Sequence, residues 1–168
     1  MTLNAKKTKL LAQGITQNAT IKELRLVNCK LRSHHMLKLS EAVGANESIE
    51  SFSFQKCNLL TMHCSYLSQC LSQNVSLKHL VLIEAGIGDL AMIELAKGIQ
   101  EAICLETIDL RFNHFERKGF EALIKAMKET MACKVLRLEG LQIEKEEAEL
   151  LGSFVRQPDC LIYEIDVH

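Results

Sequence analysis

Apolar residues recur along the chain in a pattern that repeats every 28 residues. The first copy runs over residues 21–31 with the spacing I-x-x-L-x-L-x-x-C-x-L. Successive steps of 28 give the frame Ile21, Leu24, Leu26, Cys29, Leu31; Ile49, Phe52, Phe54, Cys57, Leu59; Leu77, Leu80, Leu82, Ala85, Ile87; Leu105, Ile108, Leu110, Asn113, Phe115; Cys133, Leu136, Leu138, Leu141, Ile143. All are apolar except Asn113. Their alternation with polar residues predicts a short β-strand at the start of each unit.

The second half of each unit carries a different apolar pattern. The positions are Met36, Leu39, Val43; Cys64, Leu67, Leu71; Met92, Leu95, Ile99; Phe120, Leu123, Met127; Ala148, Leu151, Val155. Within each unit these residues lie at i, i+3 and i+7, which is the stripe of an amphipathic helix. Each unit therefore predicts a strand, a turn, a helix and a return loop.

This spacing resembles the leucine-rich repeat, L-x-x-L-x-L-x-x-N/C-x-L. The long unit with a full helix is similar to the ribonuclease-inhibitor subclass, which also includes Ran GTPase-activating protein, tropomodulin and the C-terminal arrays of NOD-like receptors. The resemblance implies an α/β fold: a right-handed solenoid in a horseshoe arc, with a parallel β-sheet on the concave face and α-helices on the convex face. The subclass shares a scaffold rather than an activity, so the resemblance alone implies no function.

The frame predicts a single leucine-rich-repeat domain over residues 1–168. Residues 1–20 match the helical half of a unit and form a capping helix or half repeat. Residues 21–160 hold five repeats of 28 residues. Residues 161–168 hold a terminal strand, because Ile162, Ile165 and Val167 fit the frame after a shift of one residue. A short self-standing array and a piece of a longer array both fit this pattern.

Composition excludes several classes of function. The net charge is −1, so no basic field suggests a nucleic-acid partner. No apolar run approaches the roughly 20 residues that span a bilayer, so no membrane partner is expected. Seven cysteines without a secretion signal favour a reducing, cytoplasmic location.

The cysteines are expected to be structural. Cys29 and Cys57 end two strands, where the family places an inward-turned Asn or Cys, and the same position holds Asn113. A metal site needs three or four converging ligands, and this position supplies only two thiols across the five units. Cys64, Cys70 and Cys133 also fall on core positions, whereas Cys104 and Cys160 lie in return loops and are expected to be more exposed.

Other motifs receive structural interpretations. His34, His35 and His63 stand at helix starts and are expected to be surface histidines. The sequons at 18–20, 46–48 and 74–76 recur one unit apart, and we interpret their asparagines as helix ends in the left-handed conformation. No phosphate loop, nucleophile elbow or carboxylate pair is present, so no catalytic, cofactor or metal site is expected.

Function is expected on the residues between the frame leucines, which face outward on the concave sheet. They combine apolar residues with charged ones, a combination typical of protein-binding surfaces. The predicted partner-binding residues are Arg25, Val27, Gln55, His79, Val81, Ile83, Asp109, Arg111, Phe112, Val135, Arg137 and Glu139.

The sequence thus predicts a non-enzymatic protein-interaction module or a subunit of a larger complex, whose partner is another protein. One alternative is a GTPase activator resembling Ran GTPase-activating protein. It would need a polar constellation at one edge, where Arg32 and Asn113 are loosely suitable but three units apart. Another alternative is the sensor array of a larger NOD-like receptor, which requires a nucleotide-binding domain elsewhere.

Overall fold

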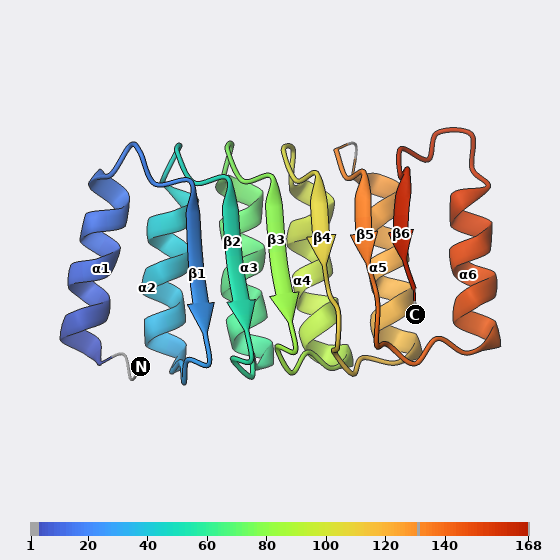
Figure 1. The fold of residues 1–168 in the computed structure, drawn as a ribbon, viewed down its shortest axis with the longest axis horizontal. Helices are drawn as coiled ribbons and strands as arrows, with labels where there is room; N and C mark the ends of the chain where they lie inside the picture. Colours follow the sequence, from blue (N-terminus) through green and yellow to red (C-terminus); the bar gives the residue numbers. More distant parts are fainter. Residues whose placement is uncertain (1–3, 131, 168) are drawn as a thin grey trace.

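Strands and helices alternate along the whole chain in a computed structural model, which describes residues 4–130 and 132–167 (Figure 1). The strands are β1 (Glu23–Val27), β2 (Ser51–Gln55), β3 (His79–Ile83), β4 (Thr107–Asp109), β5 (Val135–Arg137) and β6 (Glu164–Asp166). The helices are α1 (Ala5–Gln17), α2 (Ser33–Gly44), α3 (Thr61–Gln73), α4 (Asp89–Glu101), α5 (Arg117–Glu129) and α6 (Lys145–Val155).

The strands form one parallel sheet in the order of the sequence, β1-β2-β3-β4-β5-β6. Across the first strands each residue pairs with its equivalent one unit on, as in Arg25 with Ser53 and Ser53 with Val81. β6 joins with the predicted shift of one residue, since Val135 pairs with Glu164. The helices lie in a row behind the sheet and leave its other face open (Figure 1). An α/β fold with a parallel sheet is therefore confirmed.

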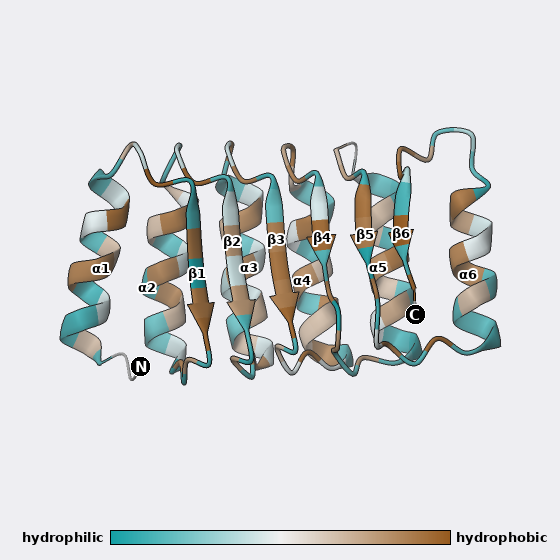
Figure 2. Cartoon of the chain, viewed as in Figure 1, coloured by the Kyte–Doolittle hydropathy of each residue, from teal (hydrophilic) through white to brown (hydrophobic). Residues whose placement is uncertain are grey.

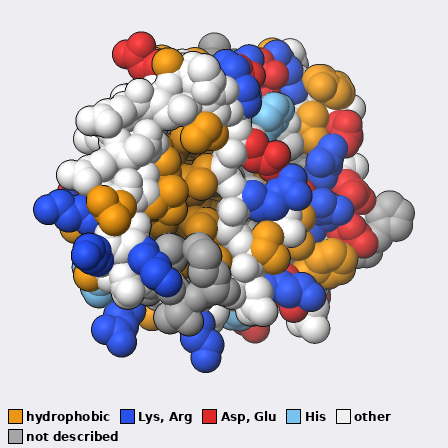
Figure 3. Space-filling view, turned by 60° about the vertical axis from the view of Figure 1, so that its left-hand side comes forward, with side chains coloured by type: hydrophobic (Ala, Val, Ile, Leu, Met, Phe, Trp, Pro, Cys, Tyr) orange, Lys and Arg blue, Asp and Glu red, His pale blue; other side chains and the backbone are white. Residues whose placement is uncertain are grey.

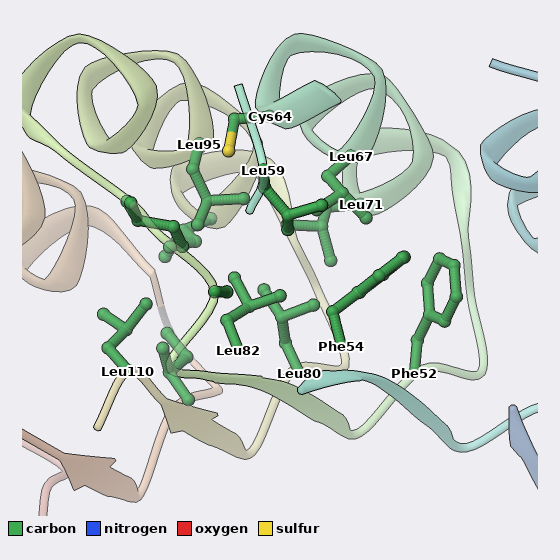
Figure 4. Packing of buried hydrophobic residues seen from close by; sticks show 14 of the residues in the cluster. Phe52, Phe54, Leu59, Cys64, Leu67, Leu71, Leu80, Leu82, Leu95 and Leu110 are labelled. Carbon is green, nitrogen blue, oxygen red and sulfur yellow. The ribbon is translucent and has the colours of Figure 1, made fainter. Parts of the chain in front are cut away.

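The frame residues form one continuous core between the sheet and the helices. Leu80 and Leu82 of β3 point towards the helix row, beside Phe52 and Phe54 of β2 (Figure 4). The two phenylalanine rings lie 4.5 Å apart, and all four side chains are fully buried. A single unit cannot enclose such a face, so each strand and helix is stabilised by packing against its neighbours in the row.

A row of asparagines connects consecutive return loops. The side-chain nitrogen of Asn74 donates to the carbonyls of Val43 and Asn46 at 2.7 and 2.8 Å. Its side-chain oxygen accepts from the backbone N–H groups of Ser76 and Leu77 at 2.8 and 2.6 Å. One buried side chain thus satisfies four backbone groups in two successive loops.

The sequence-based interpretation of these asparagines was wrong in its geometry. Asn18 and Asn74 have φ angles of −88° and −81°, so they are extended rather than left-handed. The side chain, and not a left-handed backbone, satisfies the loop. Asn46 makes the equivalent contacts to the carbonyls of Ile15 and Asn18. The amides of Asn46 and Asn74 are buried in these hydrogen bonds, which is incompatible with carrying a glycan.

The helix stripe is buried in the inner units and opens in the last one. Met36, Leu39 and Val43 of α2 are fully buried, whereas Val155 of α6 is 42% exposed. Ala148 is also exposed, although its frame position predicts burial. The reason is the position of α6, which is the last helix of the row and has a neighbour on one side (Figure 1).

Among the described residues, no helix is both long and apolar enough to cross a membrane.

Candidate functional site

The open face of the sheet carries three rows of outward-pointing side chains, one residue from each strand. Alternation along a strand turns every second side chain away from the core. The paired register places Glu23, Ser51, His79, Thr107 and Val135 in the first row and Arg25, Ser53, Val81, Asp109 and Arg137 in the second. The third row begins with Val27, Gln55 and Ile83. We call this surface the strand face.

The third row continues beyond the shortened strand β4 through backbone hydrogen bonds. The N–H of Glu84 donates to the carbonyl of Arg111, and the N–H of Phe112 donates to the carbonyl of Glu139. Arg111 and Glu139 also approach each other through an ion pair at 3.6 Å. The structure therefore brings the predicted residues of all five units onto one surface.

Apolar side chains on the strand face lie near the C-terminal ends of the first strands. Val27 is 47% exposed, and Val81 and Ile83 are partly exposed. Figure 2 shows β1 and β3 hydrophobic at their arrowheads. The partly exposed Gln55 lies between Val27 and Ile83 in the register, while Arg25 is exposed and His79, Arg137 and Glu139 are partly exposed around this area.

Two predicted partner-binding residues are buried instead. Asp109 is 1% exposed because the Arg111 guanidinium covers it, donating from Nε to Oδ1 at 2.9 Å and from Nη2 to Oδ2 at 2.8 Å. Val135 is 7% exposed and lies between Thr107 and Glu164 in the sheet. Both residues point to the strand face, but neighbouring side chains keep them from a partner.

Arg111 is held by Asp109 and by Glu139, and the hydrogen bonds that it donates to Asp109 are the leading cause that raises its pKa above the ordinary value. Its head group is thus oriented before any partner binds. Charge-assisted, two-point hydrogen bonds of this kind fix geometry as well as adding energy. Arg111 thus covers the buried Asp109 carboxylate and also contacts Glu139 of the next unit.

Phe112 lies outside the strand in which the sequence placed it. β4 ends at Asp109, and Phe112 stands in the turn with a φ of 56°. Its ring lies against Gly140 of the next unit, where a Cβ would come within 2.3 Å of the ring. The side chain nevertheless remains 47% exposed. A bulky residue in this conformation costs of order 1–3 kcal/mol, and the same turn recurs in the other units, so it is a feature of the repeat.

The left-handed turn recurs in every unit at one position after the strand. The residues are Asn28, Lys56, Glu84, Phe112 and Gly140, with φ between 48° and 75°. Beside them lies a hollow of about 320 Å³ lined by Lys56, Asn58, Glu84, Gly86, Phe112 and His114. Lys56 and Glu84 form an ion pair at 3.3 Å. These turn residues thus extend the strand face at the C-terminal ends of the strands.

The surface interpretation of two histidines was wrong. His35 and His63 are 3% and 1% exposed. The Nδ1 atom of His63 accepts the N–H of Leu60 at 3.1 Å, and His35 accepts the N–H of Arg32 at 3.4 Å. Each ring therefore caps its own helix N-terminus. Burial is the leading cause that lowers the pKa of both, so both favour the neutral form.

The cysteines occupy the core positions that the frame assigns to them. Cys29 and Cys57 are buried, and the Cys57 thiol donates to the carbonyls of Leu26 and Gln55 at 3.3 and 3.2 Å. Burial raises the pKa of Cys57. Cys104 and Cys160 are partly exposed. Residues 4–130 and 132–167 hold no group of three His, Cys, Asp or Glu side chains that could bind a metal ion.

Asn113 has the structural role that its place in the frame predicts. Its side-chain oxygen accepts from the N–H groups of Ala85 and Ile87, and its nitrogen donates to the carbonyls of Leu82 and Leu110. The residue is 5% exposed. Its polar atoms are occupied by backbone groups, which removes it from any exposed constellation with Arg32.

Several exposed apolar residues were missed by the sequence reasoning. Val75 and Ile103 are 56% and 70% exposed in neighbouring return loops, and Met62 and Leu90 are 53% and 70% exposed at neighbouring helix starts. Each pair is one unit apart, so the period could have identified them. These positions lie outside the apolar frame of strand and helix residues.

Comparison with solved structures identifies the same fold in two other proteins. A structure described as leiomodin-1 actin-binding site 2 matches with a TM-score of 0.61 and 10% identity, over 99% of this chain and 80% of that chain. The tropomodulin C-terminal domain of Caenorhabditis elegans matches with a TM-score of 0.59 and 12% identity, over 96% and 82%. No protein-family model and no curated protein matches the chain. Identities this low show a shared fold alone.

Proposed function

We propose that the chain is a non-catalytic protein-interaction module that binds a partner protein through the strand face. The observation that carries the proposal is the uncovered apolar area around Val27, Val81 and Ile83, flanked by a pre-oriented Arg111. Protein-binding surfaces combine an apolar centre with a polar rim and favour arginine. Solenoid folds characteristically use their extended strand surface for binding.

Actin is the first candidate partner to test. The structure of leiomodin-1 that shares this fold is an actin-binding site, and its likeness extends over nearly the whole chain. A cytoplasmic module in a larger actin-containing assembly also agrees with the seven cysteines, which are free in the part of the chain that the structure describes. The ribonuclease-inhibitor subclass and a horseshoe arc with a concave strand face belong to this same proposal.

The two alternatives raised by the sequence gain no support. A GTPase activator would need exposed polar groups that order a nucleotide and a water, and Asn113 is buried and fully engaged. A receptor sensor array would require other receptor domains as partners. Nothing in the fold favours such domains over any other protein partner.

The decisive test measures binding by strand-face variants. Immobilised chain is incubated with monomeric and filamentous actin and, separately, with cell extract followed by mass spectrometry. Val27→Asp and Ile83→Asp should each weaken capture at least tenfold, because they place a charge in the apolar centre. Met62→Asp is the matched control, since Met62 is 53% exposed at the start of α3, away from the strand face.

The outcomes separate the two levels of the proposal. Unchanged capture of every partner by both strand-face variants would exclude the strand face as the binding surface. Capture of another protein that both variants weaken, with no capture of actin, would keep the strand face and reject actin. Arg111 is unsuitable for this test, because its loss leaves the buried Asp109 carboxylate without a partner and destabilises the fold.

A further inference from the structure

The C-terminal end of the stack is an open apolar surface. Beyond β6 and α6 lies a hollow of about 530 Å³. Its lining includes Leu141, Ile143, Leu151, Val155, Ile165 and Val167. These residues occupy positions that are buried between units elsewhere in the stack, as Leu39 and Val43 are. The hollow therefore has the character of an interface between two repeats with one side uncovered.

The N-terminal end is open in the complementary way. Figure 3 looks towards this end and shows an apolar hollow between polar and charged surfaces. Leu10 and Ile21 are 60% and 39% exposed, and Leu11 and Leu24 are partly exposed although they pack against the core. This end begins with the helix α1, and the opposite end finishes with the strand β6. Side by side, α1 and β6 supply the helix and the strand of one complete repeat.

Helix contacts within the stack show how the two ends would fit. Gly98 of α4 lies so close to α3 that an added Cβ would come within 2.4 Å of Ser68 Cα. Three units earlier, the equivalent of Gly98 is Gly14 on α1. Three units later, the equivalent of Ser68 is Gly152 on α6. Nothing lies within 4 Å of a Cβ at Gly14, and at Gly152 the one neighbour is the flexible end of Arg156.

The charges of the two end helices are also complementary. α1 has three exposed lysines, Lys6, Lys7 and Lys9, and no acidic residue. At the other end, Glu144, Glu146 and Glu149 are exposed on α6 and its N-cap, whereas Glu147 is buried. Glu146 also pairs with Arg117 and Glu149 with Lys145, so these acidic groups are partly neutralised within the chain. Opposite potentials favour encounter and orientation of two surfaces, and they disfavour pairing of either end with itself.

We propose that a second copy of this chain docks its N-terminal end on the C-terminal end of the first. α1 of one copy packs beside α6 of the other, with Gly14 facing Gly152, and β1 continues the sheet beside β6. The contact joins two different surfaces, so it is heterologous and propagates into rings or filaments rather than closing as a two-fold dimer. It uses the ends of the stack and is independent of the strand face.

Two matched variants test this arrangement by sedimentation and light scattering over a concentration series. Gly14→Glu blocks the N-terminal end and Gly152→Glu blocks the C-terminal end, and both sites have room for a side chain in the isolated fold. The unsubstituted chain should form species larger than 18.9 kDa that grow with concentration and weaken in salt. Each variant alone should associate at least tenfold more weakly.

Mixing the variants distinguishes a head-to-tail contact from any other. Each variant keeps the end that the other has lost, so an equal mixture should form a capped heterodimer and nothing larger. Ser72→Glu, on the exposed surface of α3, should associate like the unsubstituted chain, and circular dichroism checks the fold of all variants. An unsubstituted chain that stays monomeric, variants that associate normally, or a mixture without heterodimer would each overturn the proposal.

Discussion

Asn74→Ala should destabilise the protein far more than its loss of three heavy atoms suggests. The side chain makes four hydrogen bonds to backbone groups at 2.6–2.8 Å, and the residue is 4% exposed. A buried hydrogen bond contributes about 1 kcal/mol net, and an orphaned buried group costs about 1–3 kcal/mol. In the variant, the carbonyl of Asn46 still accepts a hydrogen bond from the Ser76 hydroxyl, and the carbonyl of Val43 still accepts one from the N–H of Asn46.

The main loss is therefore the pairing of the Ser76 and Leu77 N–H groups, and the total is about 3 kcal/mol. Such a change lowers the ratio of folded to unfolded chain by roughly two orders of magnitude. Urea unfolding followed by circular dichroism measures it as a shift of the midpoint at unchanged slope.

Asn18→Ala is the matched control for this measurement. Asn18 holds the same place in the first loop, where its side-chain oxygen accepts from the N–H groups of Thr20 and Ile21 in an exposed setting. Water can replace those bonds, so the expected loss is about 1 kcal/mol or less. If Asn74→Ala costs no more than Asn18→Ala, the connecting role of the asparagine row is wrong.

Three further predictions follow from the same structure. Ala102 holds the next place in the asparagine row, and its backbone angles are similar to those of Asn74. Ala102→Asn should therefore add hydrogen bonds and raise the free energy of unfolding by about 1 kcal/mol. A lower urea midpoint would contradict this. Burial raises the pKa of Cys70 to about 12, whereas Cys104 is partly exposed. In native protein at pH 8, a maleimide should therefore label Cys104 before Cys70, as measured by mass spectrometry of the intact chain. Equal labelling rates of the two thiols would refute the burial of Cys70. Burial lowers the pKa of His63 below 6.5, so the unfolded chain takes up the proton first and stability should fall as the pH drops below about 6.5. His63→Gln keeps an acceptor for the helix cap, and should flatten that pH dependence in urea titrations at pH 5 to 8.

The order of elements could be predicted from the sequence because the period is strict. Frame residues such as Leu80 and Leu82 specify which side of each strand is buried, and the 28-residue step specifies the register of each strand with the next. Even the shifted register of β6 was visible in the spacing of Ile165. A pattern repeated five times averages out the ambiguity of any single stretch.

What the sequence could not provide is the exposure of individual side chains on the outward rows. Alternation places Asp109 and Val135 correctly on the strand face, but burial there depends on which neighbours fold over them. The same limit affected His63, whose capping contact depends on the ring turning back to the N–H of Leu60. Side-chain direction within a face is decided by local contacts, and the period carries no information about it.

The asparagine row has a consequence for the order in which the molecule opens. It holds Asn18, Asn46 and Asn74 and then stops at Ala102, while the last helix is the least enclosed. Stability in a repeat protein is a sum of local terms between nearest neighbours, so the two halves need not open together. Amide hydrogens of β5 and β6 should exchange hours before those of β2. A partner bound at Val27 and Ile83 would then contact strands that remain folded while β5 and β6 open locally.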